Sequence, residues 1–205
     1  MQLIYATGNP AKLESMRETI TPLGIEILSL RDIDVDIPEV TEIGATPLEN
    51  ARLKAMGYYE ALRRPLFACD SGLYIDGLPE TEQPGVNVRM VNGKRLSDDE
   101  MIVHYAAIAR RLGGRARARY RNAICLVADG GKTHEHFGDD ISGEAFYLVD
   151  TPHSKRVPGF PLDCLSVHIA SGEYYYDREL NKHGDAGMAS LGLRAYFKRL
   201  LEEYL

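Results

Sequence analysis

Near its start, this sequence passes from a short apolar run into a polar loop and then into an amphipathic stretch. Residues 3–6 are apolar and prone to β-structure, and the residues TGNP at 7–10 interrupt them. The stretch that follows carries apolar side chains at helical spacing: Leu13, Met16, Ile20 and Leu23. This order predicts a strand, a loop and a helix. A chain that begins in this way is constrained towards an α/β fold.

The rest of the chain continues to alternate short apolar runs with amphipathic stretches. The pattern predicts strands at 25–30, 66–69 and 119–128, and helices at 47–63, 98–112 and about 187–205. No repeat, low-complexity tract or Pro/Gly/Ser-rich linker separates these elements. We therefore expect a single domain over residues 1–205, built on a mixed sheet.

Charge, cysteine content and hydropathy exclude several classes of protein. The 24 basic and 30 acidic residues give a net charge of −6, which argues against a coat for nucleic acid or an anionic membrane. The three cysteines are widely separated and form no CxxC pair, so neither a disulfide framework nor a zinc knuckle is indicated. No apolar run approaches the ~20 residues that cross a bilayer. We expect a cytoplasmic protein, and its composition is compatible with a small anionic substrate if basic groups converge locally.

The loop at 7–12 suits such an anion. Loops at the carboxyl ends of strands line the ligand crevice of open α/β sheets, and this loop opens directly into a helix N-terminus. Thr7, Asn9 and Lys12 supply a hydroxyl, an amide and an ammonium group within one turn. Taken alone, the segment favours a simpler interpretation, in which Thr7 or Asn9 caps the helix and Lys12 is solvated.

A second polar cluster comprises Glu39, Glu42, Glu49 and Lys54. Mg²⁺ takes one or two carboxylates together with substrate oxygens, so acidic groups beside a phosphate site indicate this ion, and Glu42 is the candidate ligand. Glu49 and Asn50 are expected in the first turn of a helix, where a carboxylate favours the free N–H groups. Lys54 is compatible with a phosphate contact or with solvation.

A third cluster, Asp70-Ser71-Gly72, is expected where a buried apolar strand ends. A carboxylate there can hold Mg²⁺ or accept a proton from water, and Gly72 allows a sharp turn. An Asx-type turn is the alternative. Asp76, which precedes Gly77, is expected to form a turn.

Four segments together resemble, in order and spacing, the signatures of the inosine/xanthosine triphosphate pyrophosphatase family. They are ATGNPAK at 6–12, EIGATPLENARLKA at 42–55, CDSGLYIDGL at 69–78 and PGVNVR at 84–89. Weaker matches follow at 138–144 and 158–163. The resemblance is strong to about residue 90 and loose after it.

The resemblance implies an elongated α/β fold with a mixed sheet, two lobes flanking a central cleft and helices on the sheet faces, usually in a homodimer. It also implies Mg²⁺-dependent hydrolysis of ITP, dITP and XTP to the monophosphate and pyrophosphate, which removes these nucleotides from the pool. The residues that it implies around the triphosphate are Thr7, Asn9, Lys12, Lys54 and Ser71. Glu42 and Asp70 are implied as metal ligands, with catalysis assigned to Asp70, as general base, and to Lys12.

Two of the motifs depart from the family's pattern. Cys69 stands where the family often has the first of two consecutive acidic residues, so one carboxylate near the metal is absent. The family's GFGYDP-like element is GFPLDC here. Phe160, the expected base-stacking ring, and Asp163 remain as substrate-binding candidates, while Leu162 replaces the aromatic residue. Without the resemblance, Phe160 is more simply interpreted as a core residue.

The C-terminal motif departs further. The family's SHRG-like motif reads the 6-oxo group of the purine, whereas this chain has Lys182-His183-Gly184-Asp185. Lys182 and His183 are assigned to substrate binding, and Arg178 or Asp185 are alternatives that would alter the preferred base. The segment is equally compatible with a polar, glycine-rich loop.

Two other functions remain open. The altered motifs are compatible with a relative of changed nucleotide specificity, or with a weakened enzyme that binds nucleotides as a sensor. Four alternate arginines form a strip that is compatible with RNA binding or with a solvated strand face: Arg115, Arg117, Arg119 and Arg121. The net charge favours the solvated face, so a nucleic-acid partner is not expected.

Overall fold

The computed structural model describes residues 1–34, 40–178 and 186–204. Within these residues a seven-stranded mixed sheet has the order β2-β1-β3-β6-β8-β9, with β7 paired to β6, and β4 and β5 form a separate hairpin. The strands are β1 (Gln2–Tyr5), β2 (Glu26–Ser29), β3 (Leu66–Ile75), β4 (Met90–Val91), β5 (Lys94–Arg95), β6 (Arg115–Val127), β7 (Thr133–Phe137), β8 (Phe146–Val149) and β9 (Ser166–His168). The α-helices are α1 (Pro10–Ile20), α2 (Pro47–Leu62), α3 (Asp98–Arg111) and α4 (Ala186–Tyr204). The predicted α/β class with a mixed sheet is confirmed.

The chain divides into two compact units, and it passes between them more than once. Unit 1 comprises Met1–Ser71, Arg121–Ser142 and Met188–Leu205, and unit 2 comprises Gly72–Tyr120 and Gly143–Gly187. The single domain, the elongated shape and the central cleft stay predictions. None of the helices in the described residues is long and apolar enough to cross a membrane.

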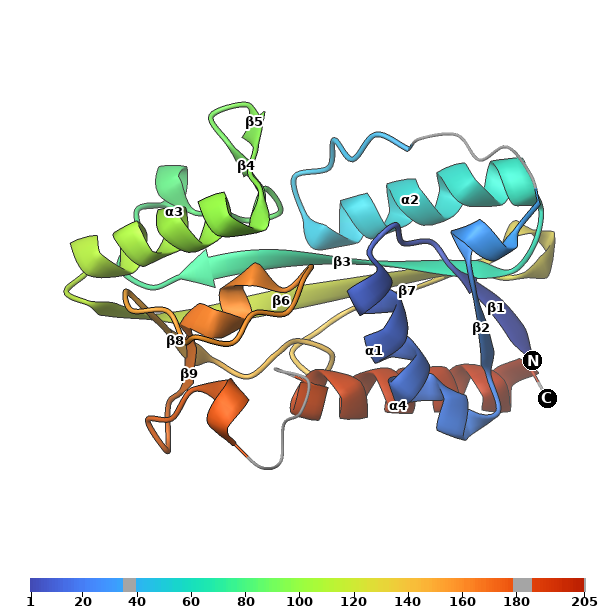
Figure 1. Cartoon of the computed structure of the whole chain (residues 1–205). Coiled ribbons are helices and arrows are strands. Elements are labelled where there is room, and N and C mark those ends of the chain that lie inside the picture. Colours follow the sequence, from blue (N-terminus) through green and yellow to red (C-terminus); the bar gives the residue numbers. More distant parts are fainter. Residues whose placement is uncertain (35–39, 179–185, 205) are drawn as a thin grey trace. The chain divides into compact units, whose positions relative to one another are not determined.

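Unit 1 is a sheet with helices on both faces (Figure 1). Side chains of α1 and α4 pack with one face of β1, β2, β3 and β6, around Phe67 and Phe197. The small residues Ala51 and Ala55 of α2 pack with the other face, against Ile4 and Ala68. Because both faces of the central strands are covered, β1 is apolar along nearly its whole length. This explains why its run of apolar residues showed no alternation.

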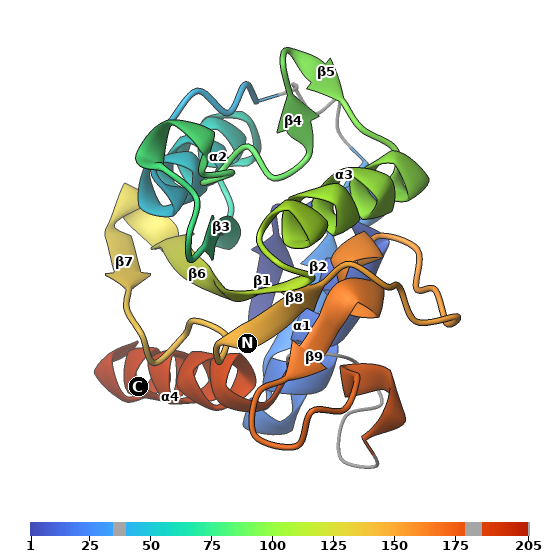
Figure 2. The ribbon, with the colours of Figure 1, turned by 90° about the vertical axis from the view of Figure 1, so that its left-hand side faces the viewer.

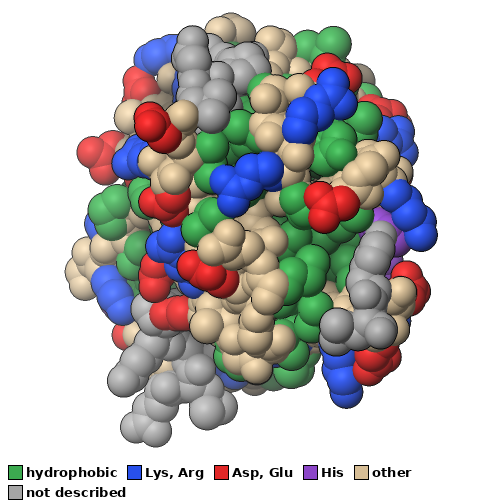
Figure 3. Space-filling model, turned by 90° about the vertical axis from the view of Figure 1, so that its right-hand side faces the viewer, with side chains coloured by type: hydrophobic (Ala, Val, Ile, Leu, Met, Phe, Trp, Pro, Cys, Tyr) green, Lys and Arg blue, Asp and Glu red, His purple; other side chains and the backbone are tan. Residues whose placement is uncertain are grey.

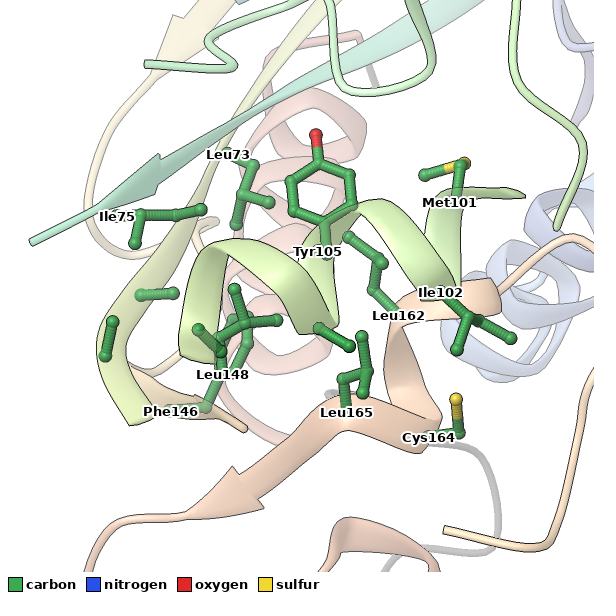
Figure 4. Close-up of a cluster of buried hydrophobic side chains, with 14 of the residues drawn as sticks. Leu73, Ile75, Met101, Ile102, Tyr105, Phe146, Leu148, Leu162, Cys164 and Leu165 are labelled. Carbon is green, nitrogen blue, oxygen red and sulfur yellow. The ribbon is translucent and has the colours of Figure 1, made fainter. Parts of the chain in front are cut away.

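Unit 2 is built around α3. This helix lies beside β8 and a short 3₁₀ helix, Pro161–Leu165 (Figure 2). Its side chains Tyr105 and Ile102 pack into the buried cluster between them (Figure 4). Leu162 and Leu165 point into this core, and Leu162 is 3% exposed. Leu162, which replaces an aromatic residue of the family's pattern, is therefore a core residue.

The predicted helix starts are confirmed in detail. The Asn9 side chain accepts hydrogen bonds from the N–H groups of Ala11 and Lys12 at the start of α1. At the start of α2, Thr46 and Glu49 form a reciprocal capping box. Asn9 and Glu49 thus have the capping roles that their positions predicted.

The predicted end of the strand at Asp70-Ser71-Gly72 is wrong. β3 continues through these residues to Ile75, and Leu73 exchanges backbone hydrogen bonds with Gly85. Gly72 does not form a turn but allows the backbone of Gly85 to pass close to β3. A Cβ at Gly72 would lie 3.2 Å from that backbone. The turn occurs at Asp76, as predicted, where Gly77 has a φ of 88°.

Candidate active site

The site begins where β1 ends beside β3. The two strands are parallel and their pairing ends at Tyr5 and Phe67, after which the N–H of Ala6 donates to the Phe67 carbonyl. Beyond this point β1 becomes the loop that leads into α1, while β3 continues. Asp70 therefore lies on a regular strand beside the loop of the predicted phosphate site.

The alternation of side chains along β3 decides what Asp70 meets. Leu66 and Ala68 pack on the face covered by α2, and Asp70 follows at the same period of two. Lys54 of α2 donates to the Asp70 Oδ1 atom at 3.1 Å. The sheet therefore brings together two residues that lie sixteen positions apart.

Lys54 also joins Glu42 to the site. Its Nζ lies 3.0 Å from the Glu42 Oε2 atom, and its side chain is only 13% exposed. Burial lowers the pKa of Lys54, but the nearby carboxylates of Asp70 and Glu42 outweigh this effect and raise it. Lys54 is thus a buried, charged ammonium group shared by two carboxylates, and the solvated interpretation is wrong.

Lys12 lies in the first turn of α1, close to the same charges. Burial lowers its pKa, as does the charge of Lys54, while Asp70, Cys69 and Glu42 act in the opposite direction. Lys12 is only partly exposed, so its interpretation as a solvated surface charge is wrong as well. A lysine in the first turn of α1, close to the charge of Lys54 from α2, favours an anionic ligand.

Thr7 and Asn9 shape the loop between β1 and α1. The N–H of Asn9 donates to the Thr7 hydroxyl at 3.2 Å, and the Asn9 side chain caps α1. Their proposed contacts with a triphosphate stay predictions. Glu39 lies outside the described residues.

Cys69 lies on the other face of β3, the one that carries Phe67. Its thiol is close to the hydroxyl of Tyr5, and burial raises its pKa to about 12. It is therefore a neutral thiol at physiological pH. Ser71, two positions later, is half-buried on the same strand.

The residues present fit a hard divalent cation. The second oxygen of Asp70, Oδ2, is buried and makes no hydrogen bond to any described residue, and the whole residue is 8% exposed. A buried carboxylate oxygen without a donor is costly unless a cation or water satisfies it. Among the described residues, no group of three or more His, Cys, Asp or Glu side chains is arranged to hold a metal. Two carboxylates with substrate oxygens are the donor set that suits Mg²⁺.

Comparison with known proteins decides the family. Residues 3–164 match the Ham1 family. The chain belongs to the Ham1 family. It is 32% identical over its whole length to a dITP/XTP pyrophosphatase of Thermus thermophilus, of which it covers 92%. It is also 38% identical over 87% of its length to the dITP/XTP pyrophosphatase of an Exiguobacterium species, of which it covers 88%.

The fold agrees with solved structures of this family. A HAM1 protein from Coxiella burnetii superposes with a TM-score of 0.77 over 98% of this chain and 99% of that one, at 22% identity. The resemblance of the four sequence segments is thus confirmed as family membership.

The remaining candidates of this Ham1 chain lie in unit 2. Phe160 is half-buried and belongs to none of the buried apolar clusters of the described residues, so its interpretation as a core residue is wrong. The loop before it is held by the N–H of Gly159, which donates to the Asp98 carboxylate at 3.0 Å. Asp163 is half-buried, and burial raises its pKa to about 7. Lys182, His183 and Asp185 lie outside the described residues.

Arg178, the alternative base-reading residue, is already engaged. Its guanidinium group lies 3.7 Å from the Glu144 carboxylate and over the ring of Tyr175. The Tyr175 hydroxyl also donates to Glu144, at 2.7 Å. Arg178 is therefore held by an acid and an aromatic ring within unit 2.

The arginine strip on β6 has local partners. Arg115 lies over the ring of Tyr147, Arg117 is 3.7 Å from Asp76, and Arg119 donates to the carbonyl of Gly143. Arg115 and Arg117 alternate with buried alanines, as the period of two predicted. The strip is consistent with a solvated strand face of mixed charge.

An apolar hollow of about 270 Å³ lies in unit 1, away from this site. Its lining includes Met1 and Pro65, which precede β1 and β3, and these strands lead at their other ends to the polar cluster. Figure 3 shows apolar side chains among charged ones on the face where the N-terminus lies. Asp129 is the one charged residue among the lining side chains, so the hollow is unsuited to a triphosphate.

Proposed function

We propose that this Ham1 protein hydrolyses non-canonical purine nucleoside triphosphates, such as ITP, dITP and XTP, to the monophosphate and pyrophosphate, and that it requires Mg²⁺. The observation that carries the proposal is the group formed by Lys54 with Asp70 and Glu42, next to Lys12 at the start of α1. It combines cations for a polyphosphate with carboxylates for a metal and a water molecule.

The class of enzyme follows from the relatives. Proteins that match this chain over nearly their whole length are named dITP/XTP pyrophosphatase, which are hydrolases of a triphosphate phosphoanhydride bond. The four residues that form the polar group lie in the segments that resemble the family most strongly. We therefore assign the hydrolysis to this site.

The residues have distinct roles in the proposed reaction. Lys12 and Lys54, with the N–H groups at the start of α1, bind the phosphates and offset the charge that develops on the leaving pyrophosphate. Asp70 orients a water molecule and accepts its proton as the water attacks the α-phosphorus and the bond to the bridging oxygen breaks. General-base help of this kind contributes on the order of 10²–10⁴-fold in rate.

Glu42 and Asp70 are the residues that would hold Mg²⁺. When bound, the ion neutralises phosphate charge and polarises the reacting phosphoryl group. Thr7, Asn9 and Ser71 would complete the phosphate-binding side of the site with hydroxyl and amide groups.

The base is the less constrained part of the substrate. Phe160 presents a partly exposed ring, and stacking on a base contributes roughly 1–3 kcal/mol. Asp163 titrates near neutral pH because of its burial, so it can donate or accept a hydrogen bond. We therefore keep changed nucleotide specificity as the alternative, with Lys182 and His183 as further candidates. A homodimer and a cytoplasmic location also stay predictions.

The first test is pyrophosphate release, with Mg²⁺, from a panel of ITP, dITP, XTP, GTP, ATP, dUTP and CTP. We expect release from ITP or XTP that falls at least 10²-fold in Asp70→Asn, since the variant keeps the shape of the side chain and loses the base. Release mainly from another nucleotide would support the alternative specificity. Nucleotide binding without release from any of the seven would contradict the proposal.

A further inference from the structure

Glu42 lies on a segment that has no secondary structure to hold it. Residues 40–44 form neither helix nor strand, and the side chain of Glu42 is 44% exposed. Before Glu42, the side chain of Val40 packs closely against α2, where a Cβ at Gly57 would lie 2.8 Å from it. After Glu42, Ile43 is 81% exposed and gives no apolar anchor. The Glu42 carboxylate lies 3.0 Å from Lys54, and a further contact holds the chain on this second side.

That contact is made by Asn50 in the first turn of α2. The Asn50 Oδ1 atom accepts a hydrogen bond of 2.7 Å from the N–H of Gly44, two residues after Glu42. Asn50 is 3% exposed, so this is a buried polar side chain that uses its oxygen on the loop. Such a bond is geometrically restrictive because both partners are held by the helix and the loop backbone.

Gly44 allows the loop to come this close. A Cβ at Gly44 would lie 2.7 Å from both the Asn50 Oδ1 and the Glu49 Cβ atoms. The next two N–H groups, of Ala45 and Thr46, donate to the Glu49 carboxylate at 2.7 and 3.2 Å. Consecutive side chains of α2 thus bind three consecutive N–H groups of the loop.

The same helix holds both ends of the arrangement. Asn50 binds the loop backbone, and Lys54, four residues later and so on the same side of α2, binds the Glu42 carboxylate. We propose that Asn50 is a positioning residue that acts through the backbone of Gly44 to place Glu42 for metal binding. Asn50 itself touches neither metal nor nucleotide. The inference rests on the role of Glu42 in the proposed function.

The test is a titration of the full chain with Mn²⁺ in the absence of nucleotide. The electron paramagnetic resonance signal of free Mn²⁺ measures the affinity. Asn50→Leu removes the acceptor in a side chain of similar size, and we expect Mn²⁺ affinity to fall about 10-fold or more. Asn50→Asp keeps an acceptor for Gly44 and should bind Mn²⁺ close to the wild-type level. If Asn50→Leu does not fold, Gly44→Ala tests the same contact. Its added methyl group pushes the loop away from Asn50, and Mn²⁺ affinity should again fall.

A double-mutant cycle separates positioning from a general structural effect. If Asn50 acts through Glu42, Asn50→Leu should cause no further loss of Mn²⁺ affinity in a Glu42→Gln background. The control is Ser97→Ala, which removes a capping bond at the start of α3 and should leave Mn²⁺ affinity unchanged. Thermal unfolding of each variant shows that it is folded at the temperature of the titration.

The outcomes also distinguish the inference from the proposed function. Wild-type affinity in Asn50→Leu, or an equal loss in both backgrounds, overturns the positioning role alone. Wild-type affinity in Glu42→Gln overturns the metal role of Glu42 in the proposed function, and the positioning role with it.

Discussion

At the scale of single residues, the presence of a charged partner decides whether a buried group stays ionised. Asp70 and Lys54 are both largely buried, and each is stabilised by the other at 3.1 Å. The Cys69 thiol, in contrast, stays neutral because burial raises its pKa to about 12. Burial also raises the pKa of Asp163, to about 7. Because this pKa differs from that of an Asp in an unfolded chain, Asp163 makes the stability of the protein depend on pH.

We expect Asp163 to make wild-type stability decrease as pH rises from about 4 to about 7. Its pKa is about 7 in the folded protein and ~3.9 in an unfolded chain, so the folded state holds more protons in this window. Asp163→Asn cannot ionise, and its free energy of unfolding relative to wild type should increase between pH 5 and pH 8. Urea unfolding at both pH values measures the difference.

The 65% exposed Leu191, which cannot titrate, provides the control for this measurement. Leu191→Ala should leave the pH dependence of wild type in place. Parallel pH dependences for wild type and Asp163→Asn would contradict the burial of an uncompensated carboxyl group at this position.

At the scale of elements, the helices are held in place by close contacts of their backbones with strands and loops, as well as by burial of apolar side chains. α2 contacts the sheet through alanines, and it binds the loop of Glu42 through Asn50. α4 approaches the loop after β7 at Gly192, where a Cβ would lie 1.8 Å from the carbonyl oxygen of Asp140. Such a distance leaves no room for a methyl group.

Gly192→Ala should therefore destabilise the protein, although alanine is the better helix former by ~1 kcal/mol. Overpacking costs about 1–3 kcal/mol, and here the obstructing atom belongs to the backbone. Urea unfolding measures the change in the free energy of unfolding. Leu191→Ala, at a 65% exposed neighbour on the same helix, should be nearly neutral. A stabilised Gly192→Ala would show that α4 is not held at this distance.

At the scale of the whole molecule, negative charge prevails and the positive charges are used locally. The net charge is −6, and the carboxylates of Asp76, Asp150 and Glu82 pair with Arg117, Arg110 and Arg111. Long-range attraction of a polyanion is therefore weak. The positive charges available to a bound polyanion are therefore local, and we assign them to Lys12 and Lys54 of the polar cluster.

We expect single-stranded RNA to bind more weakly than about 100 µM at physiological salt, the weak end of non-specific binding. Fluorescence anisotropy with a labelled oligonucleotide measures this affinity. Neutralising Arg115, Arg117 and Arg119 to Gln should change nothing within error. Tighter binding that is lost in this variant and falls steeply with salt would favour the RNA-binding alternative.

The sequence by itself determined the α/β class, most helix starts and the segments that carry the polar cluster. These features depend on local physics: periodicity of apolar residues, capping side chains such as Asn9 and Glu49, and the order of short motifs. The short strands β7, β8 and β9 were not predicted, because three to five residues are too few to show a clear period.

Only the tertiary structure decided which polar residues meet. Lys12 and Lys54 taken alone indicated solvated charges, and Asn50 indicated a first-turn residue. β1 pairs with β3, and α2 covers one face of these strands. This packing brings Lys54 between Asp70 and Glu42, and the side chain of Asn50 accepts a hydrogen bond from the N–H of Gly44. Lys54 and Asp70 lie sixteen residues apart on different elements, and even Asn50 and Gly44, only six apart, meet across a loop without regular structure. No periodicity of the sequence records such contacts, because they depend on how α2 packs on the sheet and on the loop.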